Sequence, residues 1–244
     1  MIEINSLNKS FSKKIVLSDI SFSIPKGQIV TIIGRSGVGK SILLKCLIGL
    51  VKPDSGKVYL DNQLINSMSF KQLQKIRSTI GMVFQFGALF DSMTVGENIS
   101  LALKKLTKLN PDEIHLRVKN SLDAVNMSDS ELLMPSELSG GMKKRIGIAR
   151  AIAIKPSYLL YDEPTTGLDP IMTDNINRLI HKFHNSEKVT SIIVTHELRT
   201  VFEVADRVIM LHDGKIQFDG KPNELNHSNN LIIKQFINGD STLV

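Results

Sequence analysis

Hydrophobic and polar positions repeat with two different periods along the chain. Over residues 1 to about 61 they alternate, as in short antiparallel strands, and Gly27 and the run 53–56 supply turn signals. From about residue 87 to 157 the apolar positions recur at helical spacing instead. The helices predicted there cover residues 95–106, residues 111–125 with Pro at the first position, and the stretch after Ser139. The pattern thus predicts a β layer followed by a helical subdomain of about residues 87–157.

Strands and helices alternate in the last third of the chain. Apolar strand runs and amphipathic helix runs follow one another over residues 158–161, 171–183, 191–194, 198–204 and 208–211. Such alternation predicts a parallel sheet covered by helices, with a ligand at the carboxyl ends of the strands. Helical spacing returns around residues 231–237. We therefore expect an α/β domain over residues 1–220 and a helical tail over residues 221–244.

The length and hydrophobicity restrict the class of protein. A chain of 244 residues with 42% hydrophobic residues can bury a substantial core. Its longest nearly uncharged apolar stretches reach about ten residues, whereas a membrane-spanning helix needs roughly 20. The first residues also lack the basic and apolar blocks of a signal peptide. We expect a cytosolic chain without a membrane span.

The charge distribution bears on possible partners. The formal net charge is +6, but lysines and arginines are spread along the chain, with short runs only at 104–105 and 143–145. Aromatic residues make up 5% of the chain and do not interleave with the basic ones, as they do in single-strand binders. We therefore interpret the basic residues as a solvated surface and expect no nucleic-acid partner.

A glycine-rich loop between an apolar strand and an apolar helix is the most specific motif. Residues 29–33 predict a buried strand and residues 41–48 a buried helix. Glycines let successive backbone N–H groups face the β- and γ-phosphates of a nucleotide, and the helix dipole favours the same anion. Lys40 is placed to reach those phosphates and Ser41 to bind Mg²⁺. The loop consists of Gly34, Arg35, Ser36, Gly37, Val38, Gly39, Lys40 and Ser41.

Two acids end the apolar run at residues 159–161. Asp162 can hold a Mg²⁺ ion, usually through water, because Mg²⁺ prefers oxygen ligands and dehydrates reluctantly. Glu163 is then free to orient or deprotonate an attacking water. Two solvated acids at a turn are the alternative explanation, which the glycine-rich loop makes improbable.

Two further polar residues follow predicted strands. His196 comes after the apolar run 191–194, and near a γ-phosphate its imidazole can donate a hydrogen bond and hold the loop that carries Glu163. Gln85 closes the apolar run 80–84, where a glutamine can contact Mg²⁺ or the attacking water. Because helical spacing begins just after Gln85, it is also a candidate hinge between the two parts of the chain.

The run Leu138–Met142 is a motif that a general phosphate-binding enzyme does not need. Ser139 has the residue type and position of a helix N-cap, and Gly140 and Gly141 follow it. With little side chain in the way, the start of this helix presents N–H groups and positive dipole to an anion. An ordinary capped helix is the alternative.

With these motifs in this order, the chain resembles the ATP-binding subunits of ABC transporters over nearly its whole length. The resemblance implies their fold, which is an α/β P-loop NTPase core of mostly parallel sheet with an N-terminal antiparallel β layer and a helical subdomain. The resemblance implies that residues 34–41 are Walker A, that Gln85 is the Q-loop residue and that residues 138–142 are the signature. It also implies that Asp162 and Glu163 are Walker B, that residues 167–169 are the D-loop, that His196 is the switch histidine and that Phe11 stacks on adenine. The family signature usually ends in Gln, so Met142 departs from it.

The same resemblance implies partners and cofactors. Two copies would bind two ATP molecules with Mg²⁺, each ATP lying between Walker A of one copy and Ser139, Gly140 and Gly141 of the other. ATP hydrolysis would drive an integral inner-membrane permease from its cytoplasmic side, to which the chain would be bound peripherally.

Two sequence segments are similar to the ATPases of Mla/MCE lipid transporters. They are residues 87–95 and residues 133–142, the second of which closes the signature with Met. This similarity implies transport of phospholipid or another lipid and an MCE substrate-binding protein as a further partner. The alternatives are another cargo, such as amino acids or ribonucleotides, and a soluble ABC ATPase in DNA repair or translation. The soluble enzymes usually carry a coiled-coil insertion or two tandem halves, and the chain has neither.

Overall fold

The computed structural model describes residues 1–240. The first strands form the predicted antiparallel β layer, in the order β2-β1-β4-β5. Their bounds are Ile2–Phe11 (β1), Lys14–Ile24 (β2), Ser55–Leu60 (β4) and Gln63–Leu64 (β5). Ile2 and Ile4 of β1 are buried while the next positions are more exposed, so one face of this layer packs inward, as the alternation predicts.

A second sheet of six strands lies beside this layer, in the order β10-β9-β3-β8-β7-β6. Its strands are Ile29–Ile33 (β3), Ile80–Val83 (β6), Tyr158–Asp162 (β7), Thr190–Thr195 (β8), Arg207–His212 (β9) and Lys215–Gly220 (β10). All neighbours pair in parallel except β10 with β9. The parallel core is therefore confirmed, but β3 belongs to this sheet although it lies within the first 61 residues. Every residue of β3 is buried, because both faces of a parallel sheet are covered.

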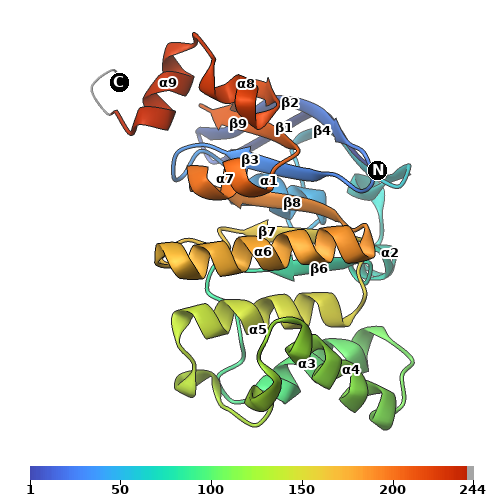
Figure 1. Cartoon of the computed structure of the whole chain (residues 1–244). Helices are drawn as coiled ribbons and strands as arrows, with labels where there is room; N and C mark the ends of the chain where they lie inside the picture. Colours follow the sequence, from blue (N-terminus) through green and yellow to red (C-terminus); the bar gives the residue numbers. More distant parts are fainter. Residues whose placement is uncertain (241–244) are drawn as a thin grey trace.

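Helices and the β layer cover the two faces of the larger sheet (Figure 1). On one face, α1 (Lys40–Leu47) and the antiparallel layer share a hydrophobic core with Val30 and Ile32 of β3. On the other face, α6 (Pro170–Glu187) shares a second core with Ile29 and with the helices of residues 95–153. Helix α7 (Leu198–Val204) contacts α6 and β8. The carboxyl end of β3 is thus held between two packed layers, at the point from which the glycine-rich loop leaves.

The helices predicted over residues 95–106 and 111–125 are confirmed to within one residue. They are α3 (Val95–Leu106) and α4 (Pro111–Ala124), and each begins with a capping box, Thr94 with Glu97 and Asn110 with Glu113. Helix α5 (Gly140–Ala153) contacts α3, α4 and β6, so it joins these helices to the sheet. Short 3-10 turns at Ser128–Ser130 and Pro135–Glu137 lead into it.

Some elements are absent from the sequence-based predictions. These are α2 (Phe70–Arg77), a 3-10 turn at Ile65–Ser67, β5 and β10, whereas α8 (Pro222–Asn226) falls within the predicted helical tail. Helix α2 carries a capping box, Ser69 with Gln72, but only Ile76 of its residues is buried, which left a weak hydrophobic signal. The tail continues with α9 (Leu231–Asn238), and residues 241–244 of the predicted tail lie outside the described residues.

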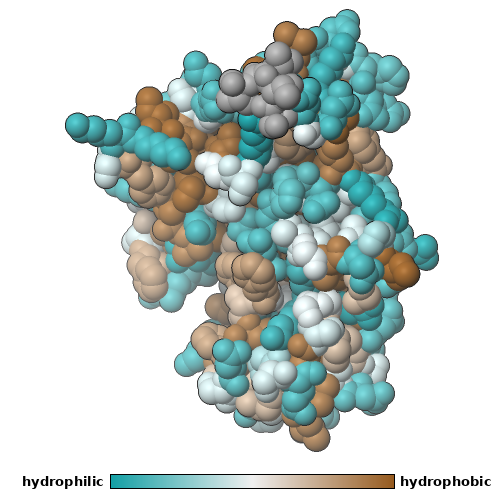
Figure 2. Space-filling view, turned by 90° about the vertical axis from the view of Figure 1, so that its left-hand side faces the viewer, coloured by the Kyte–Doolittle hydropathy of each residue, from teal (hydrophilic) through white to brown (hydrophobic). Residues whose placement is uncertain are grey.

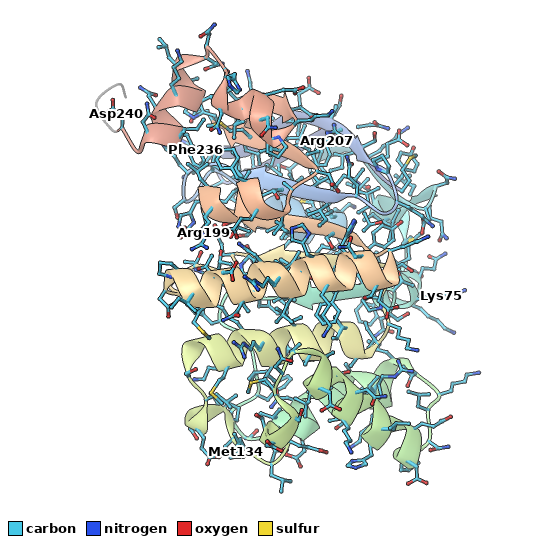
Figure 3. All side chains as sticks on the ribbon, in the orientation of Figure 1. Lys75, Met134, Arg199, Arg207, Phe236 and Asp240 are labelled. Carbon is cyan, nitrogen blue, oxygen red and sulfur yellow. The ribbon has the colours of Figure 1, made fainter. Side chains whose placement is uncertain are left out.

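The tail helices pack on the end of the larger sheet. Leu225 of α8 and Ile233 of α9 are buried in a third cluster with residues of α7 and β9, and Phe236, labelled in Figure 3, packs against it. Arg207, also labelled there, pairs with Asp219 across β9 and β10. The described part of the tail is therefore a packed element.

Hydrophilic and hydrophobic residues are mixed on the face drawn in Figure 2. Hydrophilic residues reach from the top of this face to the bottom, with hydrophobic ones interspersed. Among the described residues, we find no helix with the length and hydrophobicity that crossing a bilayer requires.

Candidate functional site

The glycine-rich loop runs from the end of β3 to the start of α1. Gly34, Gly37 and Gly39 all have positive φ angles, of 149°, 80° and 108°. A Cβ on Gly39 would lie 2.8 Å from the carbonyl oxygen of Val16, and one on Gly34 would collide with the carbonyl oxygen of Leu211. These two positions therefore require glycine. Helix α1 begins at Lys40 without a side-chain cap, which leaves its first N–H groups available to an anion.

Lys40 lies folded back over this loop. Its side chain is buried, and Nζ donates hydrogen bonds to the carbonyl oxygens of Gly34 at 2.7 Å and Arg35 at 3.2 Å. Oε1 of Glu163 lies 3.5 Å from Nζ. Burial lowers the pKa of Lys40, and the nearby Glu163 carboxylate opposes that shift. The ammonium group thus lies over the phosphate cradle, where phosphate oxygens could replace the carbonyls as its partners.

Ser41 and Asp162 lie next to each other although they are far apart in sequence. The Ser41 hydroxyl donates a 2.7 Å hydrogen bond to Oδ1 of Asp162, which ends β7. A hydroxyl and a carboxylate side by side, facing a phosphate cradle, are a donor set that fits Mg²⁺, which in nucleotide sites uses one or two protein oxygens and completes its shell with phosphate and water.

Glu163 is held from several sides in an unusual backbone conformation. Its φ angle is +53°, a strained value for a residue with a side chain. Nδ1 of His196 lies 2.9 Å from its Oε2, and the Thr166 hydroxyl donates to the same oxygen at 2.8 Å. Burial alone would raise the pKa of Glu163, but the hydrogen bonds from His196 and Thr166 outweigh it and lower the pKa. The group is therefore an oriented carboxylate at neutral pH.

These residues surround one cavity of about 380 Å³. Its lining residues are Phe11, Lys14, Val16, Ser36, Gly37, Gly39, Lys40, Ser41, Ile42, Gln85, Glu163 and His196. Phe11 is half-exposed and comes from the β layer, whereas Gln85 follows β6 of the other sheet. Gly34, Arg35 and Val38 belong to the same loop without lining the cavity. Asp162 contacts Ser41 but does not line the cavity either. The structure thus brings nine of the predicted site residues together around one cavity, from five separate segments.

The predicted signature lies elsewhere on the chain. Ser139 caps α5 by accepting a hydrogen bond from the N–H of Met142 at 3.3 Å, which confirms the predicted N-cap. Ser139 and Gly140 are exposed, and a Cβ on Gly140 would have no atom within 4 Å. None of Ser139, Gly140 and Gly141 lines the cavity of its own chain. The side chain of Met142 packs against the hydrophobic core of the helical region instead of extending toward solvent.

Lys144 and Thr166 belong to this site but were not predicted, and the interpretation of Lys144 as solvated surface was wrong. Lys144 belongs to a basic run interpreted as solvated surface, yet it is only 5% exposed. Its Nζ donates to the carbonyl oxygens of Glu163 at 3.2 Å and Thr166 at 2.8 Å. Burial lowers the pKa of Lys144 to about 8, against the opposing charges of Glu163 and Glu197. The only sequence signal was its place on the face of α5 that also carries Ile148 and Ala151.

Comparison with known proteins supports the resemblance to ABC transporters that the sequence motifs indicate. Residues 17–166 match the family described as ABC transporter. The chloroplast protein trigalactosyldiacylglycerol 3 of Arabidopsis thaliana is 40% identical over 98% of this chain and 74% of its own length. The intermembrane phospholipid transport system ATP-binding protein MlaF of Haemophilus influenzae is 36% identical over 99% and 91%. A probable ribonucleotide transport ATP-binding protein of Mycobacterium bovis, mkl, is 38% identical over 98% and 66%.

Solved structures show the same fold. An ATP-binding cassette solved as a dimer, in a post-hydrolysis state bound to ADP and inorganic phosphate, superposes with a TM-score of 0.85. It is 31% identical in sequence, and the match covers 91% of this chain and 99% of that one. The phosphate cradle, the oriented carboxylate and these similarities together show that the chain belongs to the ABC transporter family, as one of its ATP-binding and ATP-hydrolysing subunits.

Proposed function

We propose that this subunit uses ATP hydrolysis to drive a membrane permease that transports phospholipid or another lipid. The lipid cargo is supported mainly by the similarity, over nearly the full length of both chains, to an ATP-binding protein of an intermembrane phospholipid transport system. A chloroplast relative named after a galactolipid supports the same class of cargo. The sequence segments at residues 87–95 and 133–142, which are similar to Mla/MCE ATPases, also indicate a lipid cargo.

The geometry supports a role for each residue around the cavity. Phe11 at its rim offers a ring for the adenine, and the loop N–H groups with Lys40 bind the β- and γ-phosphates. Glu163 orients the attacking water and accepts its proton, while His196 holds the carboxylate in place from 2.9 Å away. Gln85 also lines the cavity, where an amide can contact that water.

Mg²⁺ fits the oxygen donors at the edge of the sheet. Ser41 and Asp162 would hold the ion, with Gln85 as a further ligand from the cavity wall. When bound, it would neutralise charge that develops on the phosphate oxygens. Ser41 and Asp162 are already joined by a hydrogen bond, so their oxygen atoms need little rearrangement.

A second copy of the chain completes the site. Because Ser139, Gly140 and Gly141 do not reach the cavity of their own chain, they are available to a nucleotide held by another. The start of α5 offers free N–H groups and a positive dipole, which suit a γ-phosphate. Each ATP is therefore held by the loop at residues 34–41 of one copy and the signature of its partner. Hydrolysis removes the γ-phosphate contact and lets the copies separate.

An apolar groove beside Gln85 suits the permease. It has a volume of about 500 Å³, lies between the edge strand β6 and helix α3, and includes Met82, Phe90, Ala102 and Leu106 in its lining. The segment that leads from Gln85 to this groove carries Phe86, which is 78% exposed. We propose that a short helix of the permease occupies this groove from the cytoplasmic side of the inner membrane. An MCE substrate-binding protein would contact the permease rather than this subunit.

A charge in that groove should separate permease binding from ATP hydrolysis. Leu106→Glu places a carboxylate against the apolar lining, so we expect permease binding to weaken by roughly tenfold or more. ATP turnover of the purified subunit should stay unchanged, since Leu106 does not line the nucleotide cavity. Pull-down of the tagged permease measures binding, and Leu116→Glu, on an exposed leucine of α4, is the matched control. Equal permease recovery with both variants would contradict the assignment.

The cargo can be identified directly. The subunit is purified with its membrane permease in detergent, and the bound small molecules are extracted and analysed by mass spectrometry. We expect phospholipid or another lipid in near-stoichiometric amount, and stimulation of ATP turnover when that lipid is returned. A bound amino acid or ribonucleotide that stimulates turnover, without lipid, would contradict the lipid assignment. A tight and salt-sensitive complex with nucleic acid would favour a soluble ABC ATPase instead.

A further inference from the structure

Helix α5 carries a cation into the interior of the molecule. Lysine is almost never fully buried unless it is paired, yet Lys144 is only 5% exposed. Within the part of the chain that the structure describes, no carboxylate lies within ion-pair distance of its ammonium group. Its hydrogen-bond partners are the two main-chain carbonyls of Glu163 and Thr166. A buried charge arranged in this way is costly to maintain, which points to a function beyond packing.

The two carbonyls mark the ends of one short turn. Residues 163–166 leave β7, and the Thr166 hydroxyl at the far end returns to donate to Oε2 of Glu163 at 2.8 Å. Lys144 therefore binds the backbone at both ends of a turn whose side chains close on the Glu163 carboxylate. The positive φ angle of Glu163 makes this support necessary, because the chain does not favour that conformation by itself.

We propose that Lys144 is a positioning residue for ATP hydrolysis, which fixes the turn carrying Glu163 to the helix that begins at Ser139. This inference rests on the proposed function, in which Ser139 contacts the ATP held by the partner copy. Glu163 acts on the ATP held by its own chain. Lys144 thus connects the two nucleotide sites of the dimer within a single chain, so that capping of one ATP helps to set the carboxylate at the other.

Replacing Lys144 by Met tests this role with little change in packing. Met keeps a long unbranched stem but has no donor, so it removes the two hydrogen bonds to the turn together with a charge that is itself costly to bury. We expect kcat to fall by roughly 10- to 100-fold, since small displacements of a reacting group have costs of this size. The KM for ATP and the melting temperature should change little, and the Hill coefficient for ATP should fall toward one. Lys144→Arg, which retains charged donors, should restore most of kcat.

Two controls make the result specific. Lys119→Met makes the same chemical change at an exposed lysine of α4 that has no hydrogen bond or ion pair among the described residues, and it should behave as wild type. Thr166→Val removes the hydroxyl that closes the turn on Glu163 and should lower kcat with KM unchanged. If Lys144→Met does not fold, the kcat of Thr166→Val tests the inference instead. Wild-type kcat in Lys144→Met, or in Thr166→Val when the first variant is unfolded, would overturn the inference.

The outcome is separable from that of the proposed function. If Ser139→Arg leaves turnover intact, the shared nucleotide site is wrong and the link between the sites falls with it. If Ser139→Arg abolishes turnover while Lys144→Met has normal kcat and Hill coefficient, the shared site stands and only the positioning role of Lys144 is refuted.

Discussion

Replacing Glu163 by Gln lowers ATP turnover by roughly 10² to 10⁴-fold while ATP binding is retained. The amide keeps the size of the side chain and can still contact Thr166 and His196, which lie 2.8 Å and 2.9 Å from Oε2 of Glu163 in the native protein. It cannot accept a proton from water. Steady-state release of phosphate measures turnover, and equilibrium binding of a fluorescent ATP analogue measures affinity.

The matched control for this variant is Glu187→Gln. Glu187 is an exposed acid at the end of α6, away from the nucleotide cavity, so its neutralisation should leave turnover and binding unchanged. Turnover of Glu163→Gln within a factor of about three of wild type would show that another group activates the water.

Replacing Ser139 by Arg abolishes turnover without weakening the binding of nucleotide to a single copy. The large cation lies on the exposed start of α5 and outside the chain's own cavity, so binding by the loop at residues 34–41 is unaffected. It blocks the contact between the signature and the γ-phosphate on the partner copy, and losing one such donor costs roughly 10²-fold or more. Ser128→Arg, on an exposed serine of the helical region, is the matched control.

Mixing two inactive variants shows whether the sites are shared. Lys40→Ala lacks the lysine over the phosphate cradle but keeps an intact signature, whereas Ser139→Arg has the reverse defect. In a two-fold dimer of one copy of each, one of the two sites is complete, so random mixing should restore at most about a quarter of wild-type activity. No recovery in mixtures shown to contain the mixed dimer would mean that each chain hydrolyses ATP by itself.

Much of the fold was predictable because local signals agreed with the tertiary structure. Strand β3, the glycine-rich loop and α1 follow from an apolar run, glycines at positions that need positive φ, and a second apolar run. Helices α3 and α4 were predicted accurately because their capping boxes and hydrophobic spacing coincide. The convergence of Ser41, Glu163 and His196 followed from the rule that parallel strands present their carboxyl ends at one edge.

Other features depend on contacts that no local pattern encodes. Strand β3 lies among the alternating first 61 residues, and its short apolar run does not specify which sheet it joins, so its placement beside β8 required the tertiary structure. A lysine in the run 143–145 is ordinarily exposed, and only the carbonyls of the turn after β7 explain its burial. The positive φ angle of Glu163 likewise results from its neighbours and not from its residue type.

A crystal structure of the Glu163→Gln variant with ATP and Mg²⁺ tests the shared nucleotide site most directly. We predict a two-fold dimer in which each γ-phosphate, held by the loop at residues 34–41 of one copy, lies within about 3 Å of Ser139 Oγ or the Gly140 N–H of the other. A γ-phosphate far from both groups, together with full wild-type turnover under the same solution conditions, would contradict the account.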